Sequence, residues 1–351
     1  MKSFFFTLDY ELFGNGSGNV FKHIIEPTDK LLAVAERFGM RFTIFFEVIE
    51  YWKLKEEWEK GNRMGYDRNP VEAMENQIRE ACRKGHDIQL HLHPQWVDAR
   101  WEEGKWTVNL EQWRLGGYAG NDENAVAELL ERGKQTLEAL LKPVDPQYVC
   151  MAMRAGGYNI QPSGAIVAAM GATGIFVDTS IYPGGKEMGL LSHYDYTDID
   201  TGKGFWHVGA RLEDVGRSEI LEVPIVAFPM MRLKKFLTWE RVRGVLGNSR
   251  LAKDSLEAKT STAEKKSRVC DKVKYFFGTE WQTWDFCLFS PSLHRLFLKQ
   301  ISKQKRNVFV LVGHPKSYTG SRGLAYLLKK THKEYGYKTI REEWGKRGIS
   351  M

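Results

Sequence analysis

The chain has 351 residues, which is enough for one large domain or two modest ones around a buried core. With 42% hydrophobic and 27% charged residues and no low-complexity tract, its composition excludes wholesale disorder. The net charge is +7, but residues 230–278 alone carry +8, from thirteen Lys and Arg against five Asp and Glu, so the rest of the chain is close to neutral.

Short β-rich runs alternate with helical stretches along most of the chain. In chain order we predict a strand at Ser3–Asp9, a helix at Pro27–Phe38, a strand at Phe42–Val48, a helix at Pro70–Lys84, a strand at Asp87–Leu92, a helix at Asn124–Leu141, a strand at Tyr148–Met153, a helix at Ser163–Met170, and strands at Gly174–Asp178, Glu219–Phe228 and Asn307–Gly313. The alternation predicts an α/β fold with a parallel sheet, and we assign residues 1–351 to a single domain. Strands that are apolar throughout are buried on both faces, as in an α/β barrel.

The alternation stops between Pro229 and about Trp284. This stretch is basic and mostly helix-like, so we predict a basic helical insertion at residues 230–284. It lacks the interleaved aromatic residues of single-strand binders, so no nucleic-acid partner is expected. One interpretation is that this insertion is simply a solvent-exposed helical segment. The other is that it contacts an anionic polymer or a membrane surface.

Three features of the sequence bear on the compartment. The cysteines, Cys82, Cys150, Cys270 and Cys287, have no CxxC spacing, which fits a reducing compartment rather than a disulfide framework or a zinc knot. The N-terminal run carries acidic residues and no small-residue cleavage site, so it predicts a first strand rather than a signal peptide. No window reaches the apolar length of a membrane span. Together these features predict a cytoplasmic protein. The sequence does not indicate an oligomeric state.

Two pairs of polar residues occur at predicted strand ends. Asp9 and Glu11 follow the first strand in "FTLDYELFG", and His91 and His93 end the third strand in "KGHDIQLHLHPQW". Side chains two residues apart on a strand point the same way, so each pair shares one side. Carboxylates and imidazoles together suit zinc or another divalent first-row metal. Each residue could also be a solvated strand end, but two such pairs favour a metal site.

Three further strand ends carry polar residues. Arg154 follows the fourth strand in "MRAGGYN", Asp178 ends the fifth in "FVDTS", and His314 follows the last in "FVLVGHPKSY". The glycines after Arg154 let the backbone approach a ligand closely. Alone, Arg154 could be a surface charge and His314 a loop cap. In a barrel, however, the carboxyl ends of the strands meet at one rim, which is where such folds place their chemistry.

The motifs "TLDYE", "GHDIQLHLHP", "RAGGY" and "LVGHP" resemble, in order and spacing from Thr7 to His314, those of the polysaccharide deacetylase family, the NodB-homology carbohydrate esterases. The resemblance implies a distorted (β/α) barrel of about seven parallel strands. It also implies hydrolysis of an N-acetyl group from a sugar. The implied cofactor is one divalent metal, with zinc expected and cobalt, nickel or manganese as alternatives.

The resemblance also assigns the metal ligands. Tyr10 stands where the family commonly has a metal-binding aspartate, so Glu11 is the expected substitute. His91 matches the first histidine ligand. Gln95 stands where the family commonly has the second, so His93 is the expected ligand and Gln95 is the alternative.

The catalytic roles follow from the same comparison. Asp9 matches the base, Arg154 the arginine that holds it, and His314 the proton donor. For the substrate, we predict contacts from Asp178 and stacking of Trp96 and Tyr158 on a sugar ring. The two aromatic residues could instead pack on the top of the barrel. His86 is predicted to be structural, closing the end of a helix.

Three functions are therefore weighed. The first is a metal-dependent N-deacetylase acting on an N-acetylated sugar or glycan precursor of a surface polysaccharide or lipopolysaccharide. The second is a metal amidohydrolase on a non-sugar amide or imide, favoured by the altered ligand motifs. The third is a non-catalytic glycan-binding relative that uses the basic segment.

Overall fold

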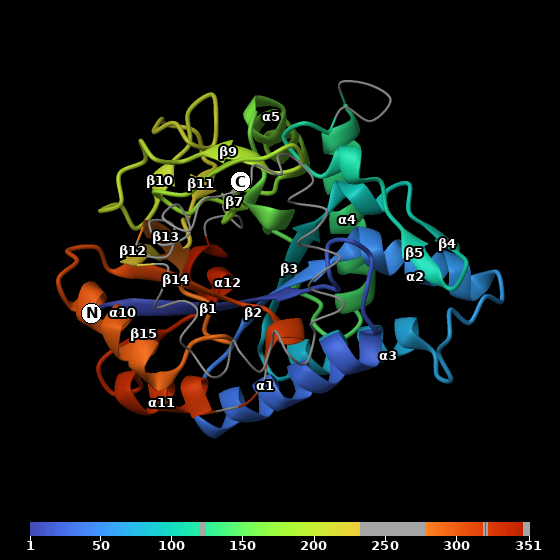
Figure 1. The fold of residues 1–351 in the computed structure, drawn as a ribbon, viewed down its shortest axis with the longest axis horizontal. Helices are drawn as coiled ribbons and strands as arrows, with labels where there is room; N and C mark the ends of the chain where they lie inside the picture. The colour runs from blue at the N-terminus through green and yellow to red at the C-terminus, as the bar shows by residue number, and fades with distance from the viewer. Residues whose placement is uncertain (119–123, 232–277, 319, 321, 347–351) are drawn as a thin grey trace, which may run out of the picture.

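The structure, a computed structural model, describes residues 1–118, 124–231, 278–318, 320 and 322–346. Its centre is a nine-stranded sheet (Figure 1). The strands are β1 (Ser3–Tyr10), β2 (Thr43–Glu47), β3 (Asp87–Leu92), β6 (Ala152–Ala155), β7 (Val177–Asp178), β10 (Trp206–His207), β11 (Leu221–Glu222), β14 (Val308–Gly313) and β15 (Gly336–Tyr337). Their order is β10-β11-β7-β6-β3-β2-β1-β14, with β15 beside β1.

Seven strands of this path, from β11 to β14, run parallel to one another, and β10 is antiparallel. Beyond β11 the chain turns back to the other edge of the sheet. Ile225 bridges Val310 of β14, and Val226 N–H donates to the Val310 carbonyl at 2.8 Å. The sheet is therefore curled into a distorted barrel, which confirms the predicted fold class and strand number.

Helices cover the outside of the curled sheet. They are α1 (Glu26–Arg37), α2 (Val48–Glu59), α3 (Pro70–Arg83), α4 (Ala125–Leu141), α5 (Gly164–Thr173), α10 (Pro291–Ser302), α11 (Arg322–Thr331) and α12 (Ile340–Trp344). In Figure 1, α1 and α11 lie along one side of the strands. Local chemistry sets the helix starts: the Asn69 side chain caps α3 ahead of Pro70, and the Ser290 hydroxyl caps α10.

Short elements connect these layers. The single-turn helices are η1 (Phe21–Ile25), η2 (Pro94–Trp96), η3 (Leu110–Gln112), η4 (Gly156–Tyr158) and η5 (Pro315–Ser317). Three two-stranded ribbons pair β4 (Arg100–Glu102) with β5 (Lys105–Thr107), β8 (Lys186–Met188) with β9 (His193–Asp195), and β12 (Ala227–Met231) with β13 (Thr279–Thr283). Elements η2, η4 and η5 each directly follow a strand of the barrel, so they shape its rim.

The core consists of strands that are buried on both faces. Every residue of β1 from Phe4 to Tyr10 is buried, as are all residues of β2 and β3. Phe4 packs edge-to-face on Trp284, with ring centroids 5.7 Å apart. This double burial is the physical reason that these strands read as continuous apolar runs.

Most predicted elements lie within three residues of the observed ones, but two strands differ more. The fourth begins at Ala152 rather than Tyr148, and the N–H groups of both Met151 and Ala152 donate to the side chain of Gln89. The stretch Glu219–Phe228 forms two strands, since Pro224 lacks the N–H that a ladder needs.

The predicted insertion at residues 230–284 falls mainly on residues 232–277, which lie outside the described residues. At its two ends the described chain forms β12 and β13, which pair antiparallel, so Thr279–Thr283 is a strand rather than a helix. The predicted contact with an anionic polymer or a membrane surface falls on the same undescribed segment. None of the helices in the described parts of the chain has the length and apolarity to cross a bilayer.

Candidate active site

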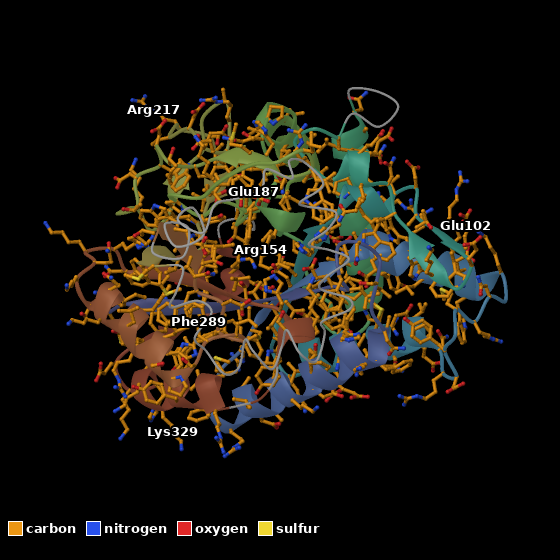
Figure 2. The ribbon with its side chains drawn as sticks, viewed as in Figure 1. Glu102, Arg154, Glu187, Arg217, Phe289 and Lys329 are labelled. Atoms are coloured by element: carbon orange, nitrogen blue, oxygen red, sulfur yellow. The ribbon has the colours of Figure 1, made fainter. Side chains whose placement is uncertain are left out.

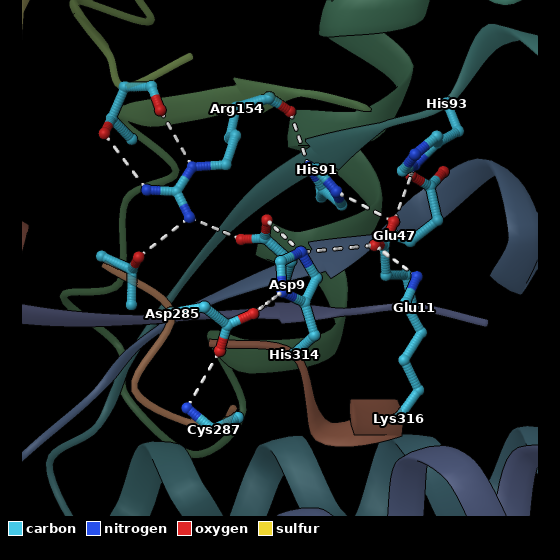
Figure 3. Close-up of polar contacts among 12 residues, drawn as sticks. Asp9, Glu11, Glu47, His91, His93, Arg154, Asp285, Cys287, His314 and Lys316 are labelled. Carbon is cyan, nitrogen blue, oxygen red and sulfur yellow. Dashed lines mark hydrogen bonds and ion pairs between the residues drawn. The ribbon is translucent and has the colours of Figure 1, made fainter. Parts of the chain in front are cut away.

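Polar side chains gather where the parallel strands end (Figure 3). They are Asp9 in β1, Glu11 directly after β1, Glu47 in β2, His91 in β3, His93 directly after β3, Arg154 in β6 and His314 directly after β14. The structure thus brings together six residues that the sequence singled out, and it adds Glu47. Parallel strands end at the same edge, so residues distant in sequence meet there.

The strand register sets the relative positions of these side chains. Glu47 pairs with His91, and His91 pairs with Arg154 on the next strand. Asp9 pairs with Phe45, two residues before Glu47, so the Asp9 and Glu47 side chains project from the same side of the sheet. The sheet itself therefore sets the spacing of the site.

Arg154 holds Asp9 in place. Its Nη1 donates to Asp9 Oδ1 at 2.5 Å and to Thr7 Oγ1 at 2.8 Å, while Nε donates to the Thr179 carbonyl at 2.9 Å. Figure 2 shows Arg154 in the middle of the molecule, and its side chain is fully buried. Burial raises the pKa of the Asp9 carboxyl, but Arg154 and two nearby histidines lower it more, so the net pKa lies below its ordinary value and Asp9 is ionised.

His314 lies between two aspartates. Its Nδ1 is 2.9 Å from Oδ2 of Asp285, and its Nε2 is 3.5 Å from Oδ2 of Asp9. The other oxygen of Asp285 accepts hydrogen bonds from the backbone N–H groups of Cys287 and Leu288, which fix its orientation. Burial lowers the pKa of His314, but the hydrogen bond and charge of Asp285 raise it more, so the net pKa is raised.

Four side chains form a group whose donor atoms all lie within 4.8 Å of one another: Glu11, Glu47, His91 and His93. The distance from Glu11 Oε2 is 3.2 Å to His91 Nε2 and 3.1 Å to His93 Nδ1, and His93 Nδ1 is 2.8 Å from Glu47 Oε2. All four residues are buried. Ligands of one zinc ion lie roughly 3–4 Å apart, so these residues fit a divalent metal in donor type and spacing.

Contacts outside the donor group orient its members. His91 Nδ1 lies 2.8 Å from the backbone oxygen of Arg154, and because that oxygen can only accept, Nδ1 carries a proton and Nε2 faces Glu11. A metal-binding histidine is commonly held in this way. Glu47 Oε1 accepts from the Ile49 N–H and caps α2, which leaves Oε2 directed at His93. Gly156 packs on His93 so closely that an added Cβ would lie 2.2 Å from the ring.

Lys316 lies on the outer side of Glu11. Its Nζ donates to Glu11 Oε1 and to the Leu12 carbonyl, both at 2.6 Å. The Leu12 N–H donates to the buried carboxyl of Glu50 at 2.9 Å, which pins this turn against α2. Burial raises the pKa of Glu11, but Lys316 and then the two histidines lower it more, so its net pKa lies well below the ordinary value.

Gln95 and Trp96 both lie in η2, just after β3, and both are buried. Gln95 is fully buried and its Nε2 donates to the Gly14 carbonyl at 3.3 Å, while its Oε1 has no hydrogen-bond partner; His93 belongs to the group of four donors. Trp96 is 1% exposed and packs edge-to-face on Trp106 with ring centroids 5.4 Å apart. An indole buried in this way offers no face to a sugar, so the predicted stacking by Trp96 is not supported.

The other two predicted substrate residues differ from each other. Tyr158 is half-buried at the rim, where burial and the neighbouring Asp9 carboxylate raise its pKa. Its ring lies edge-to-face on Tyr182, with centroids 4.9 Å apart. Asp178 is fully buried, accepts from the Ser180 N–H and hydroxyl, and pairs in register with Glu222. The predicted contact of Asp178 with a substrate stays a prediction.

Three residues of the site were absent from the predictions. Glu47 had a detectable signal, because it is a polar residue at the end of an apolar strand, like Asp9 and His91. Asp285 and Lys316 had none of comparable strength. Asp285 follows the segment where the strand alternation stops, and Lys316 resembles an ordinary loop lysine after His314 and Pro315.

No protein-family model matches the chain, and a search of curated proteins finds no match. Similar solved structures include a Mycobacterium smegmatis protein described as a polysaccharide deacetylase, with 13% identity and a TM-score of 0.46 over 99% of this chain and 90% of that one. A Pseudomonas aeruginosa protein of the same description has 12% identity and a TM-score of 0.44, covering 98% and 91%. An allantoinase has 12% identity and a TM-score of 0.45, covering 98% and 90%.

Proposed function

We propose that the protein is a metal-dependent hydrolase that cleaves an amide bond, and that its substrate is an N-acetylated amino sugar in a precursor of a surface polysaccharide or lipopolysaccharide. One observation carries the proposal: a buried group of four metal-type donors lies beside an ionised Asp9 and a His314 held by Asp285. This combination supplies a base, an acid and an electrophile at one rim. The sugar is proposed from the motif resemblance.

The metal is proposed to bind Glu11, Glu47, His91 and His93, with zinc as the expected ion and cobalt, nickel or manganese as ions that such donors also accept. A divalent ion at this position would polarise the acyl carbonyl and lower the pKa of a bound water. The structure fits such an ion because imidazole nitrogens and carboxylate oxygens converge, and because Nδ1 of His91 and Oε1 of Glu47 are already engaged elsewhere.

The protein side chains then move the protons. Asp9 accepts a proton from the attacking water while Arg154 keeps its carboxylate ionised and oriented. As the new C–O bond forms and the C–N bond breaks, His314 Nε2–H donates its proton to the leaving amine. Because His314 Nε2 and Asp9 Oδ2 are 3.5 Å apart, the proton on Asp9 can return to His314 and reset both groups.

A second substrate class is a non-sugar amide or imide. The buried Trp96 favours it, because the site lacks the open indole that the sugar interpretation expected. A substrate panel of N-acetylhexosamine conjugates, cyclic ureides and acetylated polyamines separates the two classes. Acetate release from the hexosamines alone supports the sugar deacetylase, and ring opening of a ureide supports the alternative. A non-catalytic binding relative would turn over none of them with metal bound.

A further inference from the structure

Lys316 makes the closest cationic contact to the donor group. Its ammonium lies 2.6 Å from Glu11 Oε1, while the other oxygen of Glu11 faces His91 and His93. Figure 3 shows the Lys316 side chain reaching Glu11 from η5, on the side away from the histidines. Its side chain is 12% exposed, so water screens this ion pair only weakly. A single carboxylate therefore links a fixed cation to the donor atoms.

The charges of the group explain why such a cation matters. Glu11 and Glu47 bring two buried carboxylates within reach of one another, and unpaired buried carboxylates repel strongly. The nearby charge of Arg154 is matched by Asp9 and cannot serve this purpose. The helix N-terminus that Glu47 caps stabilises one carboxylate. Lys316 contacts the other.

The position of Lys316 is itself fixed. The Leu12 carbonyl accepts its second hydrogen bond at 2.6 Å, and the Leu12 N–H is held by Glu50. The Phe13 ring lies 5.5 Å from the ammonium. An ammonium with these contacts is a permanent part of the site, and its field acts on any divalent ion that the donors take up.

We propose that Lys316 is a built-in counter-cation: it holds Glu11 in its metal-binding position when no ion is bound, and it lowers the affinity of the site for a divalent ion. The inference rests on the metal site of the proposed function but not on the reaction. Its ammonium stabilises the ion-free arrangement and repels a dication, so the site exchanges metal more readily than four such donors would without it.

The test measures zinc affinity by competition with a chromogenic chelator, and Tm with and without zinc. We expect Lys316→Met to bind zinc at least about tenfold more tightly and its metal-free form to melt at a lower temperature than wild type. Lys316→Arg keeps the charge and should resemble wild type in both measurements. Lys142→Met, which removes an exposed partner of Glu138 far from the site, is the matched control and should change neither.

Lys316→Gln keeps an N–H donor without the charge, so it replaces the methionine variant if that one fails to fold. Unchanged or weaker zinc binding in the uncharged variants would overturn the proposal, as would an arginine variant that behaves like them. Acyl hydrolysis is scored separately. If the uncharged variants bind zinc more tightly but the wild type hydrolyses no substrate, the proposed function is wrong and the role of Lys316 stands. If the wild type hydrolyses a substrate but the variants bind zinc with unaltered affinity, the proposed function stands and the role of Lys316 is wrong.

Discussion

Asp285 Oδ2 lies 2.9 Å from His314 Nδ1, and this contact turns the opposite ring nitrogen of His314 toward Asp9. Asp285 arrives just after β13 and His314 just after β14, and the backbone bridge between Asp285 and Val312 brings the two together. The pair connects the acid of the proposed reaction to a buried carboxylate that is itself held by backbone N–H groups.

The first prediction concerns the pH profile of Asp285→Asn. Burial lowers the pKa of His314, and Asp285 more than offsets that effect, so removal of the negative charge should lower the His314 pKa. A general acid must be protonated, so the alkaline limb of kcat/KM should move to lower pH, with activity at neutral pH reduced about tenfold or more. Rates of acetate release across pH 5–10 provide the measurement. Asp214→Asn, near the surface, is the control. An alkaline limb of kcat/KM at the same pH in wild type, Asp285→Asn and Asp214→Asn would refute this role of Asp285.

The second prediction separates His93 from Gln95. His93→Ala should weaken zinc binding by about tenfold or more, because it removes a donor atom that contacts both carboxylates of the group. Gln95→Ala should weaken zinc binding much less than His93→Ala, because the Gln95 side chain is anchored through its Nε2 to the Gly14 carbonyl whereas His93 contacts both carboxylates of the group. Elemental analysis and chelator competition on the two variants check this. A larger loss in Gln95→Ala would reverse the assignment.

The third prediction uses the close packing of Gly156 on His93. A Cβ at position 156 would lie 2.2 Å from the His93 ring, so Gly156→Ala should displace the imidazole and weaken zinc binding. Gly171→Ala in α5 is the matched control, since nothing lies within 4 Å of its added Cβ. Zinc titrations of both variants give the comparison. Equal affinities would mean that His93 tolerates the displacement or is not a donor.

The fourth prediction concerns stability and the buried pair Asp178 and Glu222. Burial, and then the charge of Asp178, raise the pKa of Glu222 well above its ordinary value, so folded Glu222 holds its proton where the unfolded chain has lost it. Above pH ~4.3, the folded state therefore binds more protons than the unfolded state, and this residue's contribution to stability falls as pH rises through its folded pKa. In Glu222→Gln the side chain does not ionise, so this pH-dependent loss of stability disappears.

The free energy of unfolding of Glu222→Gln, relative to wild type, should accordingly increase between pH 5 and pH 9 by about 1 kcal/mol or more. Urea denaturation at intervals across this range measures it. Glu219→Gln, at an exposed position two residues before Leu221, should show no such trend. If the difference in free energy of unfolding between Glu222→Gln and wild type stays constant with pH, Glu222 has the same pKa in the folded and unfolded states and the prediction is wrong.

Much of the site was predictable because its residues obey strand periodicity. Asp9 with Glu11, and His91 with His93, repeat at a spacing of two at the ends of apolar runs, and the parallel sheet brings such ends together. Glu47 obeys the same rule and could have been predicted. It was missed because β2 runs directly into α2 with no turn residue, and Glu47 is at once the last strand residue and the helix cap.

Other features depend on packing that periodicity does not encode. Trp96 follows Pro94 in a short helical turn that directs the indole inward against Trp106, although its place after a site strand suggested an exposed ring. Asp285 reaches His314 only through a bridge to β14 across residues far apart in sequence. The predicted structural role of His86 fits its buried hydrogen bond from the Phe42 N–H, and burial lowers its pKa to about 4.

The central claim is tested most directly by acetate release from N-acetylhexosamine conjugates, measured with metal-stripped protein, with zinc-restored protein and with zinc-restored Asp9→Asn. We predict release only from the zinc-restored wild type, with the asparagine variant slower by about 100-fold or more while binding the same amount of zinc. Release that survives metal removal, or that persists at the full rate in Asp9→Asn, would contradict the account.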